Sequence, residues 1–123
     1  MPDHARMDLI QFLEQTNADV LRLEKEGEEA LQREGQRAFQ VKLEEKAKLL
    51  AALGENAWEY TEKIEGALGA EIATQLEQFS TSAGAALRIG SVFFMTALLY
   101  PEDHKPGDPN DLAVFIEELR QRS

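Results

Sequence analysis

The stretch FSTSAGAALRIGSVFFMTALLY, from Phe79 to Tyr100, has one charged side chain, Arg88, in a chain of which 29% is charged. A helix that is apolar all the way round must be covered on every side, by the rest of its own chain or by a second chain. Pro101 ends the stretch, because proline cannot continue a helical hydrogen-bond ladder. The fold is therefore decided by how much of this stretch the other segments can cover.

Those other segments have the apolar spacing of amphipathic helices, at intervals of three and four residues. The first predicted helix has its seam at Leu9, Leu13, Thr16, Val20, Leu23, Gly27 and Ala30. A second, from about residue 36 to 68, has the seam Phe39, Leu43, Lys46, Leu50, Leu53, Ala57, Tyr60, Ile64 and Ala67. The third ends at Pro101 and has the seam Ile72, Leu76, Phe79, Ala83, Ala86, Gly90, Phe93 and Ala97. A short fourth helix presents Leu112, Phe115, Ile116 and Leu119 on one face.

Glycine and proline mark the boundaries between these helices. The seam changes phase at Gly35, which predicts a turn, and the segment GALGAE at 66–71 predicts the next one. The seam keeps its phase through Gly54, so one long second helix is favoured, although a new helix starting near Glu55 remains an alternative. Asp108 before Pro109 is predicted to cap the fourth helix.

Short turns make consecutive helices antiparallel neighbours. The sequence therefore predicts an all-α, up-down-up-down antiparallel bundle with three long helices and a short C-terminal fourth helix. Residues 1–123 are long enough for one domain and too short for two.

This topology leaves the far end of the third helix thinly covered. Its neighbours there are Leu23, Leu31, Phe39, Leu43 and the short fourth helix. We expect several of its large apolar residues to remain exposed and to form an interface with a second copy or with another helical protein. The predicted interface residues are Arg88, Ile89, Val92, Phe93, Phe94, Met95, Leu98 and Leu99. The alternative is a fully intramolecular core closed by a well-placed fourth helix.

The net charge and the amino-acid composition limit the classes of partner and the location that we expect for this chain. The formal net charge of -10 repels phosphate backbones, so no nucleic-acid partner is expected. The chain has no cysteine, which agrees with a reducing, cytoplasmic location. The amino-terminal residues lack the uninterrupted apolar core of a signal peptide. About a dozen apolar residues follow Arg88, a helix of roughly 18 Å, so no transmembrane segment is predicted.

Acidic residues on adjacent helical turns raise the possibility of a metal site in a helical bundle. The segment LEKEGEEALQ, at 23–32, resembles the acidic helix of the all-α nucleotide pyrophosphohydrolases. That resemblance implies a metal-dependent hydrolase using Glu24, Glu28 and Glu62. The second half of the family pattern, a glutamate followed three residues later by an aspartate, is missing. Solvated helix faces are the simpler interpretation of these glutamates.

The preferred hypothesis is a non-enzymatic protein-interaction module: a small acidic adaptor, chaperone or regulatory subunit that self-associates through its apolar third helix. No catalytic residue, cofactor or metal ligand is predicted. The metal-dependent hydrolase is one alternative. A second is an amphipathic coat protein that lies on an apolar surface.

Overall fold

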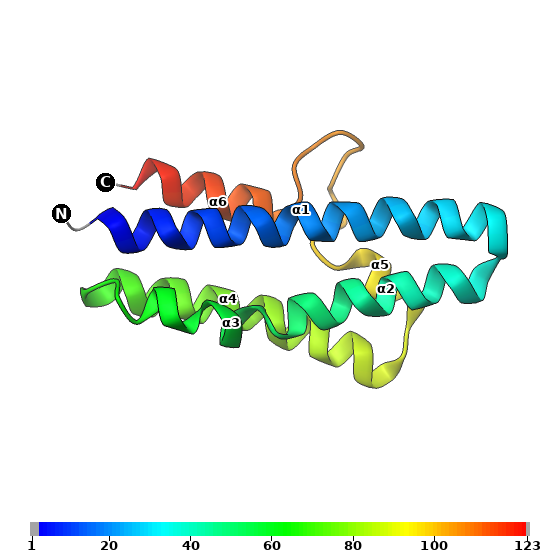
Figure 1. Cartoon of the computed structure of the whole chain (residues 1–123), viewed down its shortest axis with the longest axis horizontal. Coiled ribbons are helices and arrows are strands. Elements are labelled where there is room, and N and C mark those ends of the chain that lie inside the picture. The colour runs from blue at the N-terminus through cyan, green and yellow to red at the C-terminus, as the bar shows by residue number, and fades with distance from the viewer. Residues whose placement is uncertain (1–2, 123) are drawn as a thin grey trace.

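The computed structural model describes residues 3–122, whose regular structure is helical throughout (Figure 1). The chain forms α1 (Asp3–Glu34), α2 (Gln36–Ala51), α3 (Leu53–Thr61), α4 (Gly66–Ile89), α5 (Val92–Ala97) and α6 (Asp111–Gln121). The all-α class is confirmed. The predicted second and third helices are each divided in two, so the bundle only partly matches three long helices and a fourth. Within the described part of the chain, no helix is both long and apolar enough to cross a lipid bilayer.

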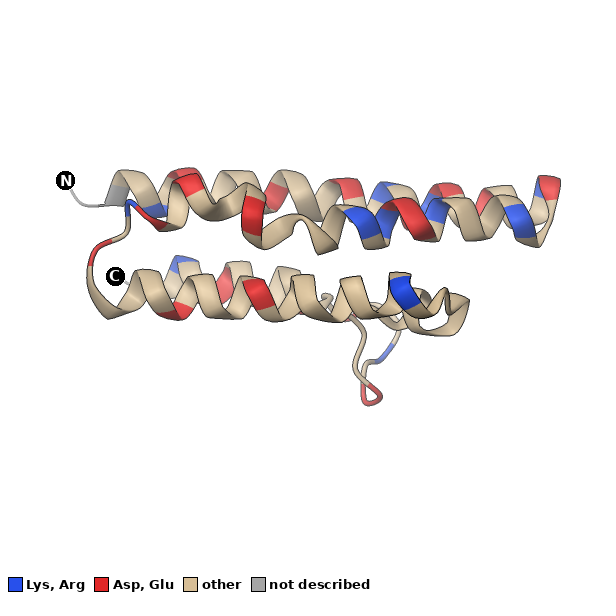
Figure 2. Ribbon diagram, turned by 90° about the horizontal axis from the view of Figure 1, so that it is seen from below, with Lys and Arg blue, Asp and Glu red and all other residues tan. Residues whose placement is uncertain are grey.

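The helices lie in two layers (Figures 1 and 2). One layer contains α1 and, antiparallel to it, α2 continued by α3. The other contains α4, which packs on α2 and α3, and α6, which packs on α1. The short α5 packs on α2 and α4. Because α6 is much shorter than α1, only one end of the bundle has a full fourth helix.

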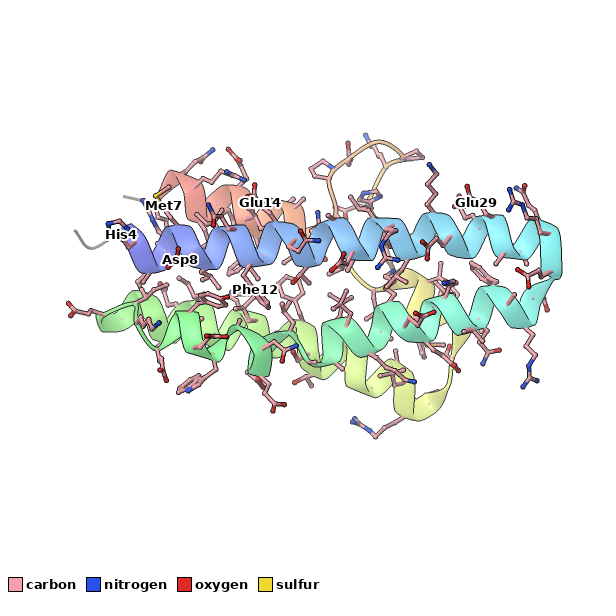
Figure 3. The ribbon with its side chains drawn as sticks, in the orientation of Figure 1. His4, Met7, Asp8, Phe12, Glu14 and Glu29 are labelled. Carbon is pink, nitrogen blue, oxygen red and sulfur yellow. The ribbon has the colours of Figure 1, made fainter. Side chains whose placement is uncertain are left out.

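The apolar seams of the helices face one another and form the core. The larger cluster joins α1, α2, α3, α4 and α6 and includes Leu9, Leu50, Leu53, Ile72 and Leu112. At its edge the ring of Phe12, on the side of α1 that faces α3, stacks on Tyr60 with centroids 5.1 Å apart (Figure 3). A smaller cluster of Leu43, Ala47, Ala86 and Met95 lies under α5. These buried positions follow the 3.6-residue period, as the sequence predicts.

The predicted single helix from 36 to 68 is wrong, because it is interrupted at Ala52. The Gly54 N–H donates to Ser80 Oγ at 2.9 Å, and Ser80 Oγ donates to the Leu50 carbonyl at 3.0 Å. The Ser80 hydroxyl thus replaces the direct hydrogen bond that a continuous helix would form between the Gly54 N–H and the Leu50 carbonyl. A side chain inserted into the helical ladder in this way is an established cause of a kink. The helix restarts at Leu53, slightly before the alternative start near Glu55.

The turns lie close to the predicted glycines. Gly35, with φ of +101°, separates α1 from α2, which confirms the first turn. The second turn comes earlier than predicted, since α3 ends at Thr61 and Gly66, with φ of +76°, already begins α4. Gly69 therefore lies inside α4 rather than in the turn.

The predicted continuous third helix is also wrong, because α4 ends at Ile89. Gly90 adopts a left-handed conformation, with φ of +70°, and the Ser91 N–H donates to the Ala86 carbonyl at 3.3 Å. This is the pattern of a Schellman C-cap, in which glycine is preferred. Ser91 then caps α5, its Oγ accepting from the Phe94 N–H at 3.1 Å.

Asn110, and not Asp108 as predicted, caps the last helix. Its Oδ1 accepts from the Ala113 N–H at 2.8 Å, and its Nδ2 donates to Asn17 Oδ1 at 2.9 Å. The second bond fixes the start of α6 at the middle of α1. From there α6 runs back toward the start of α1, where Arg6 donates to the Leu119 carbonyl. Consequently α6 covers the first half of α1 and not the region around α5.

Candidate functional site

The predicted interface residues divide between the interior and the surface. Met95 and Leu99 are buried, and Val92 and Leu98 are half-buried. Three large apolar side chains are exposed together where α4 meets α5: Ile89 by 66%, Phe93 by 74% and Phe94 by 49%. Apart from Arg88 in the last turn of α4, this corner is uncharged, and its ribbon is almost entirely tan in Figure 2.

The orientation of α5 explains this division. Met95 points into the cluster formed with Leu43, Ala47 and Ala86, which anchors one side of α5. Phe93 and Phe94 are adjacent to each other and lie on the outer side. Their rings meet edge to face, with centroids 5.5 Å apart. We call Phe93, Phe94 and Ala97 the α5 ridge.

A groove of about 650 Å³ runs along one side of the α5 ridge, where no fourth helix covers α1 and α2. We call it the hairpin groove. Its apolar walls are formed by Leu31, Phe39, Leu43, Phe93 and Ala97. Its polar residues are Glu24, Glu28, Lys46, Thr96 and Tyr100. On the other side of the ridge, a second groove of about 430 Å³ is bordered by Ile89, Phe94, Ala97 and Leu98.

Lys46 fixes α5 to the rest of the bundle. Its side chain is only 1% exposed, and Nζ donates to the carbonyls of Met95 at 3.2 Å, Thr96 at 3.4 Å and Leu98 at 3.1 Å. Carbonyls at the end of a helix lack intrahelical donors, so a buried cation there satisfies them and complements the helix dipole. Glu24 Oε2, 2.8 Å from Nζ, balances the charge.

Tyr100 completes this buried network. Its hydroxyl donates to Glu24 Oε1 at 2.6 Å, and its ring lies 5.2 Å from Lys46 Nζ, within cation–π range. Burial lowers the pKa of Lys46 below its ordinary value of 10.5, and the Glu24 carboxylate partly opposes this effect. Burial, and then the hydrogen bond to Glu24, raise the pKa of Tyr100 well above its ordinary value of 10.0. The network therefore joins α1, α2 and α5 at the hairpin groove.

The raised pKa of Tyr100 gives a pH-dependent prediction. Above pH 10.0 the unfolded chain loses the phenol proton and the folded chain keeps it, so folding is opposed. The stability from this group is thus fully present below pH 10.0 and is lost as pH rises toward the folded pKa. Urea unfolding of wild type and Tyr100→Phe, from about pH 8 to about pH 11, should give a stability difference that shrinks above pH 10. A difference that stays constant, or grows, would contradict the assignment.

The three glutamates of the hydrolase alternative do not come together. Glu24 and Glu28 line the hairpin groove, and Glu24 already pairs with Lys46 and Tyr100. Glu62 follows the last residue of α3, at the end of the molecule where α1 begins (Figure 1). Among residues 3–122, no group of three or more His, Asp or Glu side chains is placed to hold a metal ion.

Two charged side chains on the helices around α5 form no hydrogen bond or ion pair within residues 3–122. Arg88 forms no hydrogen bond or ion pair in the described chain, and neither does Glu28 on the wall of the hairpin groove. Some charged side chains nearby are paired: Arg22 on α1 bonds Glu26 at 3.2 Å, and Lys42 on α2 bonds the same carboxylate at 3.1 Å.

Sequence reasoning missed Lys46 and Tyr100 as parts of this site. A signal for Lys46 was present, because a lysine occupies a seam position between Leu43 and Leu50 that should face the core. No comparable signal marks Tyr100, whose partner Glu24 is distant in the sequence. The chain matches no protein-family model, no curated protein and no solved structure.

Proposed function

We propose that this chain is a non-enzymatic protein-interaction module, an adaptor, chaperone or regulatory subunit, that self-associates through the corner between α4 and α5. The observation that carries the proposal is the joint exposure of Ile89, Phe93 and Phe94 on a surface with a single charge. Complete burial of one such side chain contributes about 1.5 to 3 kcal/mol. Association with a second copy buries three of them on each chain.

The position of α6 supports this proposal. The alternative of a fully intramolecular core requires the last helix to cover α5, but α6 packs on the first half of α1. Hydrogen bonds from Lys46 and the packing of Met95 attach the inner side of α5 to the bundle, so the outer side, which carries the α5 ridge, is preorganised. A preorganised surface loses little conformational entropy when it binds.

Light scattering of the purified chain at tens of micromolar tests the proposal. The wild type is expected to be dimeric, and Ile89→Glu and Phe94→Glu are expected to be monomeric because each places a charge in the buried contact. The matched control is Trp58→Glu: Trp58 on α3 is also a large exposed side chain, away from α5, and its replacement should leave the dimer intact. A monomeric wild type would refute self-association, and equal dissociation by all three variants would refute the assigned surface.

A further inference from the structure

The shape of the surface around α5 indicates which groove a second copy would occupy. The α5 ridge stands between the hairpin groove on one side and the smaller α4-side groove on the other. A ridge beside a groove is self-complementary under a twofold rotation, since each ridge can enter the groove of the other copy. The hairpin groove is the larger of the two and is bounded by α1, α2 and α5.

We propose that, in the self-association described above, the α5 ridge of each copy fills the hairpin groove of the other and Arg88 of each copy pairs with Glu28 of the other. This inference rests on the proposed function and specifies the contact. The ridge would occupy the position that a longer fourth helix would fill, against Leu31 on α1 and Phe39 on α2.

The arrangement of charges favours a second copy as the occupant. Arg88 is the only lysine or arginine between Lys63 and Lys105, and it lies at the end of α4, the helix that borders the α4-side groove and not the hairpin groove. When a twofold rotation places one ridge in the other groove, the end of α4 comes over the far wall of that groove. That wall is the part of α1 that contains Glu28. Two charges that form no ion pair within residues 3–122 of one copy thus become partners in the pair.

A specific dimer sets a minimum size for the contact. A stable interface buries about 800 Å² on each partner, or about a tenth of a small protein's surface. The accessible surface of this chain is 7830 Å². An interface with the α5 ridge at its centre, Arg88 at one edge and Glu28 at the other would cover parts of α1, α2, α4 and α5. Interfaces of this kind have an aromatic centre and a charged rim.

Charge reversal tests the pairing by sedimentation velocity at one fixed concentration. Arg88→Glu alone and Glu28→Arg alone each create two like-charge contacts in a homodimer, so each should weaken dimerisation by at least about tenfold. An equimolar mixture of the two variants should dimerise again, because both contacts in the mixed pair are then between opposite charges. Circular dichroism of each variant confirms that the helices are intact.

A second pair of variants tests the groove independently of the charges. Leu31 and Leu21 are both exposed leucines of α1, but Leu31 lines the hairpin groove and Leu21 faces the cleft beside α6. Leu31→Glu should abolish the dimer, and Leu21→Glu should leave it unchanged.

The outcomes separate the inference from the proposed function. Self-association through this surface is supported if the wild type dimerises and Phe94→Glu prevents dimerisation. The proposed contact between ridge and groove is nevertheless refuted if the mixture of charge variants stays monomeric or if Leu31→Glu stays dimeric. If either charge variant alone dimerises as well as the wild type, the Arg88–Glu28 pairing is likewise refuted. A monomeric wild type would overturn both.

Discussion

Replacing Lys46 by methionine is expected to lower the free energy of unfolding by about 3 kcal/mol, as measured by urea denaturation followed by circular dichroism. Methionine fills the same space but leaves the carbonyls at the end of α5 without a donor and the Glu24 carboxylate without its cation. The expected loss is at the low end for a broken buried ion pair, because the Glu24 side chain is partly exposed to solvent in the hairpin groove.

Two control variants isolate the cause. Lys42→Met on the same helix removes an ion pair with Glu26 that is open to solvent, so its effect should be small. The double variant Lys46→Met with Glu24→Gln should be more stable than Lys46→Met alone, because no unpaired carboxylate remains. If Lys46→Met were as stable as Lys42→Met, the buried network would not be the element that holds α5.

Loss of Lys46 should also weaken self-association. The cation holds α5 at its carboxyl end, and α5 carries Phe93 and Phe94. A loosened α5 no longer presents a fixed ridge, so the entropy cost of binding rises. The buried network thus links stability to the proposed interface.

Replacing Gly69 by alanine is expected to cost about 2 to 3 kcal/mol of stability, and replacing Gly54 by alanine should change it little. A Cβ at Gly69 would lie 2.2 Å from the Ile64 carbonyl oxygen and 3.2 Å from that of Thr61. Both obstacles are backbone atoms, one in the last residue of α3 and one in the turn that follows, so α4 or this backbone has to shift. Thermal unfolding monitored by circular dichroism measures the difference between the two variants.

Gly54 is the matched control because the group nearest to a Cβ there is movable, and the next side chain, Ser80, lies farther away, at 3.3 Å. That Cβ would lie 2.4 Å from Glu77 Oε1, at the end of an exposed and flexible side chain that can turn away. Alanine in a helix also gains about 1 kcal/mol over glycine, which offsets the rearrangement. If Gly69→Ala melted together with Gly54→Ala, the close contact between α4 and the preceding turn would not constrain the fold.

Much of the fold could be predicted because helical periodicity is a local property. The seam from Leu9 to Ala30 specifies α1, and the phase change at Gly35 specifies the first turn. The prediction placed Gly90 in the seam of a continuous third helix, whereas the structure ends α4 there, with Gly90 in the left-handed conformation that glycine favours. Within the candidate site, the sequence indicated surplus apolar residues but not which ones face outward. The break at Gly90 decides that, since it sets the orientation of α5 independently of α4.

The amino-acid sequence by itself determined an all-helical chain with more apolar residues near its third quarter than its short last helix can cover. Composition and periodicity depend only on residues close together along the chain, so both can be read without a structure. Only the tertiary structure decided that Ser80 interrupts the helix at Ala52, that Lys46, Glu24 and Tyr100 meet under α5, and that α6 lies away from the ridge. These features depend on contacts between residues 22 to 93 positions apart, which exist only once the helices have packed.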